Sequence, residues 1–124
     1  MTSRISEIVI KAHDPLKLAE FWCEVLGFTV LDADDGAVEI GPDAGFGGIQ
    51  PTVVFVPTVE PKTEPLRLHF DVNALDRDQN AELERLIALG ARRVDIGQGD
   101  QVSWQVLADP EGNEFCLLRT QLEP

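Results

Sequence analysis

Basic residues are scarce in this sequence. Its 124 residues hold ten lysines and arginines against 22 aspartates and glutamates, which gives a formal net charge of −12 at pH 7. A negative field of this size repels nucleic acids and anionic lipids, so neither a nucleic acid nor a membrane surface is an expected partner. The same field would attract a cationic ligand, although most acidic surfaces only keep a protein soluble.

Long apolar runs and paired cysteines are missing as well. No stretch approaches the roughly 20 apolar residues that span a bilayer, and the opening "MTSRISEIVI" lacks the basic and apolar regions of a secretory signal. The two cysteines, Cys23 and Cys116, lie in apolar surroundings and form no CxxC motif. We therefore expect a cytoplasmic protein with reduced thiols, long enough for one domain with its own hydrophobic core.

The common catalytic motifs are absent too. No serine, histidine and aspartate stand in a recognisable triad motif, and no glycine motif for phosphate binding is present. The glycines of "AGFGGIQ" have no strand-to-helix context and fit a flexible loop beside a site. Candidate residues therefore have to be found from the pattern of strands and helices.

The first half of the chain has the order strand, helix, strand, strand, strand. Residues 5–12 are suited to a strand that has one apolar face and one mixed face: Ile8, Ile10 and Ala12 on the first, and Glu7, Val9 and Lys11 on the second. Asp14 and Pro15 are suited to open a helix, which ends at Gly27. The segments "FTVLDA", "AVEIG" and "TVVFVP" follow as strands, separated by turn and loop residues.

The same order returns in the second half. The strand "LRLHFDV" precedes a helix that we expect to begin at Asp76 and end at Gly90, and three strand-like segments follow: "ARRVDIG", "QVSWQVLAD" and "EFCLLRT". The sequence therefore predicts an α+β fold in a single domain, residues 1–124. Its two βαβββ modules are expected at residues 5–57 and 66–120.

Alternation within "LRLHFDV" places three ionisable side chains on one side of a strand: Arg67, His69 and Asp71. A shift of 62 residues superimposes the two expected helix starts. It also places Glu7 on His69, each seven residues before its helix. We therefore expect Glu7 and His69 to point into a common hollow.

Several segments resemble the vicinal oxygen chelate superfamily, also called the glyoxalase/bleomycin-resistance/dioxygenase superfamily. They are "HDPLKLAEFWCEVLGF", "RLHFDV", "LIALGARRV" and, most specific, "VSWQVLADPEGNEFCLL", which contains the turn residue Asn113. The strand "RLHFDV" and the ending "DPEGNEFC" are similar to its glyoxalase-like branch, found largely in bacteria. The resemblance covers almost the whole chain. It implies paired modules around a U-shaped cleft, and a homodimer, because many members are dimers.

The resemblance also implies positions for a divalent metal, which members hold with the first and fourth strands of their modules. Glu7 and His69 fall at the first-strand positions, and Cys116 stands where a glutamate is usual, three residues after Asn113. In the fourth strand of the first module, the plausible cleft-facing positions, such as Val54 and Val56, are apolar and cannot bind a metal. Glu7, His69 and Cys116 could hold zinc, nickel or iron, but they suit magnesium and manganese poorly. Alternatively, Cys116 is a small buried hydrophobe and His69 a hydrogen-bond partner.

Four further residues are candidates for ligand binding. Arg67 could clamp a carboxylate or phosphate, or it could form an ion pair at the rim of the sheet. Asp71 could orient a catalytic imidazole. Glu114 could reach the mouth of the cleft, or it could only close the turn. Trp104 could stack on a planar ligand, or it could pack in the core.

Two functions fit these features. The first is an isomerase or lyase acting on a small carbonyl or hydroxy compound, with His69 as base or metal ligand, Glu7 as its partner and Arg67 as an anion clamp. The second is a non-enzymatic protein of the bleomycin-resistance type, which sequesters a small cationic molecule in the cleft. The ionisable cluster around His69 favours the enzyme, whereas the net charge of −12 favours sequestration.

Overall fold

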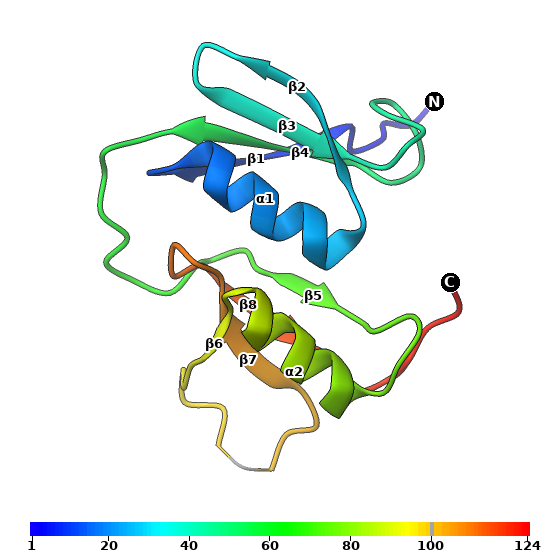
Figure 1. Cartoon of the computed structure of the whole chain (residues 1–124), viewed down its shortest axis with the longest axis vertical. Coiled ribbons are helices and arrows are strands. Elements are labelled where there is room, and N and C mark those ends of the chain that lie inside the picture. Colours follow the sequence, from blue (N-terminus) through cyan, green and yellow to red (C-terminus); the bar gives the residue numbers. More distant parts are fainter. Residues whose placement is uncertain (100) are drawn as a thin grey trace. The chain divides into compact units, whose positions relative to one another are not determined.

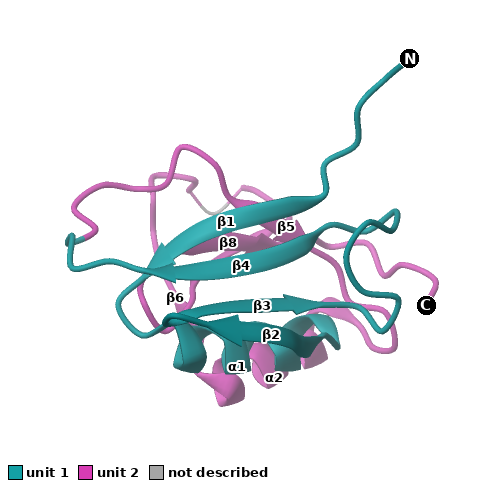
Figure 2. Ribbon diagram, turned by 90° about the horizontal axis from the view of Figure 1, so that it is seen from above, with its two compact units in different colours: residues 1–61 teal, residues 62–124 magenta. Residues whose placement is uncertain are grey.

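The computed structural model describes residues 1–99 and 101–124 and divides into two compact units, Met1–Pro61 and Lys62–Pro124. Figure 1 shows the elements along the chain, and Figure 2 colours the two units separately. Each unit contains one helix and one four-stranded sheet, in the order strand, helix and three strands. The predicted α+β fold of two βαβββ modules is therefore confirmed.

The first unit contains one long helix over a mixed sheet. Its elements are β1 (Glu7–Ala12), α1 (Pro15–Leu26), β2 (Thr29–Asp34), β3 (Ala37–Gly41) and β4 (Thr52–Pro57). The strand order is β1-β4-β3-β2, in which β1 and β4 are parallel and the other pairs antiparallel. Figure 1 shows α1 lying along one face of this sheet, which leaves the other face free for polar residues.

Local signals explain where α1 begins and ends. The Asp14 side chain accepts a hydrogen bond of 3.2 Å from the Lys17 amide, and Pro15 occupies the first helical position. Gly27 ends the helix in the left-handed region, with φ at 68°, which a glycine adopts without strain. The apolar side of the helix is buried, and Trp22 is only 2% exposed. The expected helix is therefore confirmed at both ends.

The second unit repeats this topology with shorter strands. Its elements are β5 (Phe70–Val72), α2 (Gln79–Leu89), β6 (Arg92–Arg93), β7 (Gln105–Ala108) and β8 (Glu114–Leu117). The strand order is β5-β8-β7-β6, again with the first and last strands parallel. The core residues of this unit include Leu86, Leu107, Phe115 and Leu117, all fully buried. Within the described ranges, no helix combines the length and the apolar content needed to cross a membrane.

The strand expected over "LRLHFDV" is mostly not a strand. Only Phe70–Val72 pair, and residues 66–69 lie outside any strand. The reason is the length of the partner strand: Phe70 pairs with Phe115, and β8 begins only at Glu114. Residues before position 69 therefore have no strand opposite them. Their alternating sequence was not sufficient to place them in a strand.

Two other predicted strands are also much shorter than expected. Residues 91–97 reduce to the two residues of β6, and residues 101–109 reduce to β7. Between them, Gly97 and Gly99 adopt positive φ angles of 91° and 73°, which interrupt an extended chain. The second unit consequently carries a long irregular segment where the first has paired strands.

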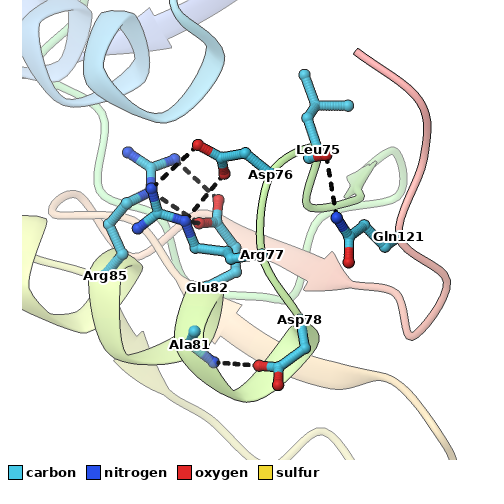
Figure 3. A network of polar contacts seen from close by, with 8 residues as sticks. All are labelled: Leu75, Asp76, Arg77, Asp78, Ala81, Glu82, Arg85 and Gln121. Atoms are coloured by element: carbon cyan, nitrogen blue, oxygen red, sulfur yellow. Dashed lines mark hydrogen bonds and ion pairs between the residues drawn. The ribbon is translucent and has the colours of Figure 1, made fainter.

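The start of α2 differs from the expectation. The helix is capped by Asp78, whose side chain accepts a hydrogen bond of 2.8 Å from the Ala81 amide. Asp76 instead accepts hydrogen bonds from Arg77, at 2.9 and 3.2 Å. Figure 3 shows both contacts, together with the bidentate pairing of Arg85 with Glu82 on α2, at 2.7 and 2.8 Å. The side chain of Glu82 is 8% exposed, so this ion pair is largely shielded from water.

The parallel strand pairs correct the alignment of the two units. Ala12 pairs with Pro57 in the first unit, and Val72 pairs with Leu117 in the second. Each pair is followed by the same backbone hydrogen bond, from the next residue of the last strand back to the first strand. These strands therefore align with a shift of 60 residues rather than 62, and the residue that corresponds to His69 is Val9, not Glu7.

Candidate functional site

The sheet of the second unit brings two distant segments together. In the parallel register of β5 and β8, Asp71 lies directly opposite Cys116. His69 precedes Asp71 by two residues, and its Nε2 lies 3.1 Å from Asp71 Oδ1. The potential ligand atoms of His69, Asp71 and Cys116 all lie within 4.8 Å of one another. This is the only such group of three acidic, histidine or cysteine residues among the described residues.

The three side chains differ in their exposure. The His69 and Asp71 side chains are 46% and 49% exposed, whereas Cys116 is 6% exposed as a residue. Cys116 thus forms the floor of the group, and the imidazole and the carboxylate stand at its open side. A small molecule approaching from solvent would meet these two groups first.

The contact between His69 and Asp71 indicates which nitrogen of the imidazole carries a hydrogen. An ionised carboxylate only accepts hydrogen bonds, so Nε2 must carry the hydrogen that it donates to Asp71. In the neutral ring, the lone pair then lies on Nδ1. Asp71 therefore orients the ring, as the sequence suggested for this aspartate.

The Cys116 thiol is kept protonated by its surroundings. Burial raises the pKa of Cys116, and the neighbouring Asp71 raises it further through its charge and through a hydrogen bond with the thiol. Nucleophilic cysteines have lowered pKa values. Cys116 is therefore unsuited to act as a free nucleophile, although a bound metal could still displace its proton.

A hollow of about 410 Å³ opens beside the three residues. Trp104 contributes to its wall and is 39% exposed, so it is a lining residue and not a core residue. The indole offers a flat apolar surface on which a planar ligand could stack. The lining consists of His69, Asp71, Ile96, Gly97, Gln98, Trp104, Cys116 and Leu118.

Sequence reasoning missed four of these lining residues. Ile96, Gly97 and Gln98 belong to the irregular segment after β6, which the pattern assigned to a strand and a turn. Nothing in their order indicated that they would cover the face that carries Cys116. Leu118 could have been found, because it is two residues after Cys116 and alternation gives both the same side.

Trp104 and Gln98 also border a second hollow of about 470 Å³. Arg93 lines this hollow and donates a hydrogen bond of 3.2 Å to the Gln105 side chain. The second hollow contains none of the three clustered donors. Trp104 and Gln98 therefore line both hollows, and only the first hollow is lined by His69, Asp71 and Cys116.

Glu114 stabilises the segment that leads to His69. Its side chain, 14% exposed, accepts a hydrogen bond of 2.6 Å from Lys62 Nζ and one of 2.8 Å from the Leu66 amide. Burial raises the pKa of Glu114, but the hydrogen bonds from Lys62 and the Leu66 amide, together with its own backbone amide and the charge of Lys62, outweigh burial and lower the pKa. Glu114 thus ties the irregular residues before β5 to β8, and it is not among the lining residues of the hollow.

Arg67 and Glu7 stand outside this cluster. Arg67 precedes β5, is exposed, and is not among the residues that line the hollow. Glu7 is the first residue of β1 in the other unit, on the exposed side of that strand. The pairing of Glu7 with His69 remains a prediction, and the contact that the structure gives to His69 is with Asp71.

The chemistry of the three donors fits a divalent metal. Zinc accepts imidazole, carboxylate and thiolate ligands together, typically with water in a fourth position. Magnesium and manganese prefer oxygen donors, and a thiolate is a poor ligand for them. His69 and Cys116 were metal candidates from the sequence, whereas Asp71 was expected only to bind a ligand or to orient the histidine.

Comparison with known proteins identifies the family. The glyoxalase-like domain family matches residues 7–118, which is most of the chain. No curated protein matches the sequence. Solved structures match as well, and the three described below are 15–19% identical to this chain.

Three solved structures illustrate the fold. The fosfomycin resistance protein FosX from Listeria monocytogenes, complexed with Mn(II) and sulfate, is 15% identical with a TM-score of 0.73, over 98% of this chain and 94% of that one. FosX from Mesorhizobium loti is 19% identical with a TM-score of 0.67, over 98% and 95%. A glyoxalase/bleomycin resistance protein/dioxygenase family enzyme from Burkholderia phytofirmans PsJN is 16% identical with a TM-score of 0.69, over 93% and 97%. The chain therefore belongs to the glyoxalase-like domain family, within the vicinal oxygen chelate superfamily that its motifs resemble.

Proposed function

We propose that this protein binds a small carbonyl or hydroxy compound in the hollow beside His69 and moves a proton on it, as an isomerase or a lyase does. The observation that carries the proposal is the oriented pair of His69 and Asp71 at the open side of the hollow. Trp104, on the wall of the same hollow, supplies a surface for the apolar part of the ligand.

His69 acts in this proposal in one of two ways. As a base, it takes a proton from the substrate on Nδ1, while Asp71 holds Nε2–H and stabilises the imidazolium. As a metal ligand, it joins Asp71 and Cys116 in holding a divalent ion, which would supply a Lewis acid for the substrate oxygen. The Mn(II) complex of the structurally similar FosX supports the second way.

Three parts of the proposal rest on the family and not on contacts. Glu7 would be the second catalytic group, because it lies on the exposed side of β1 and a superfamily site draws on both modules. Arg67 would bind an anionic group of the substrate from its exposed position before β5. A homodimer in the cytoplasm is the expected form, since many superfamily members are dimers and both cysteines are free.

Hydrogen exchange tests the proposed proton transfer without knowledge of the product. The full chain is incubated in D2O with methylglyoxal, hydroxyacetone or dihydroxyacetone, and proton NMR follows loss of the hydrogen next to the carbonyl. We expect catalysed exchange that falls by about 10²-fold or more in His69→Asn. The control is His13→Asn, because His13 is the other histidine, lies in the first unit and does not line the hollow; its Nε2 lies 2.7 Å from the Glu60 backbone oxygen. Equal exchange rates in His69→Asn and in the unaltered chain would contradict the proposal.

Sequestration of a cationic molecule is the second candidate. The charge of −12 supports it, as does the absence of lysine and arginine among the described residues that line the hollow. Asp71 and Trp104 would then bind the cationic and planar parts of the ligand. Saturable binding of ethidium, weakened by Trp104→Ala, together with no exchange of any carbonyl compound, would favour this function over catalysis.

A further inference from the structure

We propose that the second unit binds zinc by itself, through His69, Asp71 and Cys116, with Asp71 as the third protein ligand in place of Glu7. The proposal rests on the site of the proposed function and names the metal that this site takes. From the sequence, Glu7 was the third candidate ligand, because the family resemblance and the 62-residue shift placed it at the position that corresponds to His69. The strand pairing removes this alignment and supplies a carboxylate from the same unit instead.

Backbone pairing holds the three donors together. Asp71 and Cys116 are direct partners in the parallel register of β5 and β8, so their separation is fixed by the sheet. The His69 imidazole already contacts Asp71 at 3.1 Å. Glu114 fastens the segment before His69 through the Leu66 amide, at 2.8 Å. The donors therefore need only small side-chain movements, since their ligand atoms lie within 4.8 Å of one another.

The thiol of Cys116 determines which divalent metal the site would bind most tightly. A buried thiolate is a strong ligand for zinc and a weak one for manganese or magnesium, which prefer oxygen. The similar FosX structure from Listeria monocytogenes contains Mn(II). This chain shares the fold but has Cys116 on the fourth strand of the second unit, where it lies beside Asp71. We therefore expect zinc here and not manganese.

The number of protein ligands gives the type of zinc site. Structural zinc has four protein ligands, whereas zinc with three protein ligands and one water is typical of catalytic sites. Asp71 and His69 are about half exposed and line the hollow, so the remaining position would be open to a small molecule there. This links the zinc to ligand binding and not to stability alone.

Zinc titration of the full chain is the first test. The protein is prepared without a histidine tag, freed of metal with a chelator, and titrated with zinc against a competing indicator. We expect one zinc per chain, and at least about tenfold weaker binding in Cys116→Ser and in Asp71→Asn. The matched controls are Cys23→Ser and Asp76→Asn, a free cysteine on α1 and an exposed aspartate before α2, which should bind zinc like the unaltered chain.

Cobalt(II) gives a second readout that is independent of activity. A thiolate bound to cobalt produces a charge-transfer band in the near ultraviolet, and tetrahedral cobalt absorbs strongly in the visible. We expect both in the unaltered chain and no charge-transfer band in Cys116→Ser. Cys116→Ala serves as the second variant, and circular dichroism confirms that each variant is folded.

Other outcomes would overturn the proposal. They are no zinc bound by the folded chain, a cobalt spectrum without the thiolate band, or a loss of affinity in Glu7→Gln that Asp71→Asn does not show. These results are separable from failure of the proposed function. A folded chain that binds no zinc but still exchanges substrate hydrogen through His69 would overturn the zinc site and support His69 as the base.

Discussion

The two units share one topology but differ in how regular they are. In the first unit β1, β2 and β4 have six residues each, whereas in the second β5 has three and β6 two. The residues that lost strand pairing in the second unit precede β5 and follow β6, and both segments border the hollow. Regular pairing therefore gives way in the segments that contain His69 and Ile96, whereas Asp71 and Cys116 lie on paired strands.

The two sheets also differ in the residues on the faces that carry polar side chains. In the first unit, Thr52 donates a hydrogen bond of 2.8 Å to Glu39, and apolar Val54 lies next to Glu39 in the strand register. In the second unit, the corresponding face carries Asp71 beside Cys116. The two units therefore share a backbone topology, and the candidate site depends on a few residues that differ on the second sheet.

The largest expected effect on stability is the difference between substitutions of the two tryptophans, one in each unit. Trp22 is 2% exposed and packs edge to face on Phe21, with 5.3 Å between ring centroids, whereas Trp104 is 39% exposed. We expect Trp22→Ala to lower the free energy of unfolding by about 3–5 kcal/mol and Trp104→Ala by less than about 1 kcal/mol. Urea unfolding followed by circular dichroism measures both. Equal losses would break the distinction between core and lining residue.

The turn before β8 gives the next largest effect. Asp109 is 2% exposed and accepts hydrogen bonds from the Glu111 amide and from the amide and side chain of Asn113, at 2.9, 3.0 and 2.9 Å. Asp109→Ala should cost about 2–3 kcal/mol, because it leaves these donors unsatisfied. The control is Asp43→Ala, in the exposed loop that precedes the last strand of the first unit. Thermal unfolding should show a change of under about 0.5 kcal/mol for this control.

In the first unit, neighbouring strands approach each other closely at Gly41. A Cβ at Gly41 would lie 2.7 Å from Leu31 Cδ1 and 2.7 Å from Thr52 Cγ2. The Leu31 methyl can move, but Thr52 is fully buried, so Gly41→Ala should cost about 1–2 kcal/mol. Gly48→Ala is the control, since its nearest neighbour would be a backbone oxygen at 4.0 Å. A neutral effect at Gly41 would mean that this sheet is less tightly packed than described.

The smallest effect concerns the two helix starts. Asp78 caps α2 as Asp14 caps α1, so Asp78→Ala should lower stability by about 1 kcal/mol. Asp76→Ala removes only the exposed contact with Arg77 and should have a smaller effect. Chemical denaturation of the two variants compares them directly. A larger loss at Asp76 would restore the helix start that the sequence suggested.

The first unit could be predicted closely from its sequence. Strong local signals fixed α1, with a capping aspartate, a proline at the first position and a glycine at the end. The segments "AVEIG" and "TVVFVP" coincide with β3 and β4. Each of these elements satisfies its own pattern and its neighbours at the same time, so local and tertiary preferences agree.

The second unit was predicted less well, because the ends of its strands and of its helix depend on residues far away in the sequence or on specific hydrogen bonds. Alternation suggested a strand from Leu66, but a strand needs a partner and β8 starts only opposite position 69. The sequence indicated Asp76 as the start of α2, whereas it is Asp78 that accepts a hydrogen bond from the Ala81 amide and caps the helix. Within the candidate site, the placement of Asp71 opposite Cys116 could not be predicted, because pairing between strands 45 residues apart leaves no local signal.

The parallel pairing of β5 with β8 also sets an order of assembly. The sheet of the first unit is complete once β4 ends at Pro57, whereas the second sheet requires the last strand of all. During synthesis, the earlier unit can fold while His69 and Asp71 are already made but Cys116 is still to come. The candidate site therefore cannot form before β8 has been made, and a ligand or metal bound there would stabilise chains in which β5 and β8 are paired.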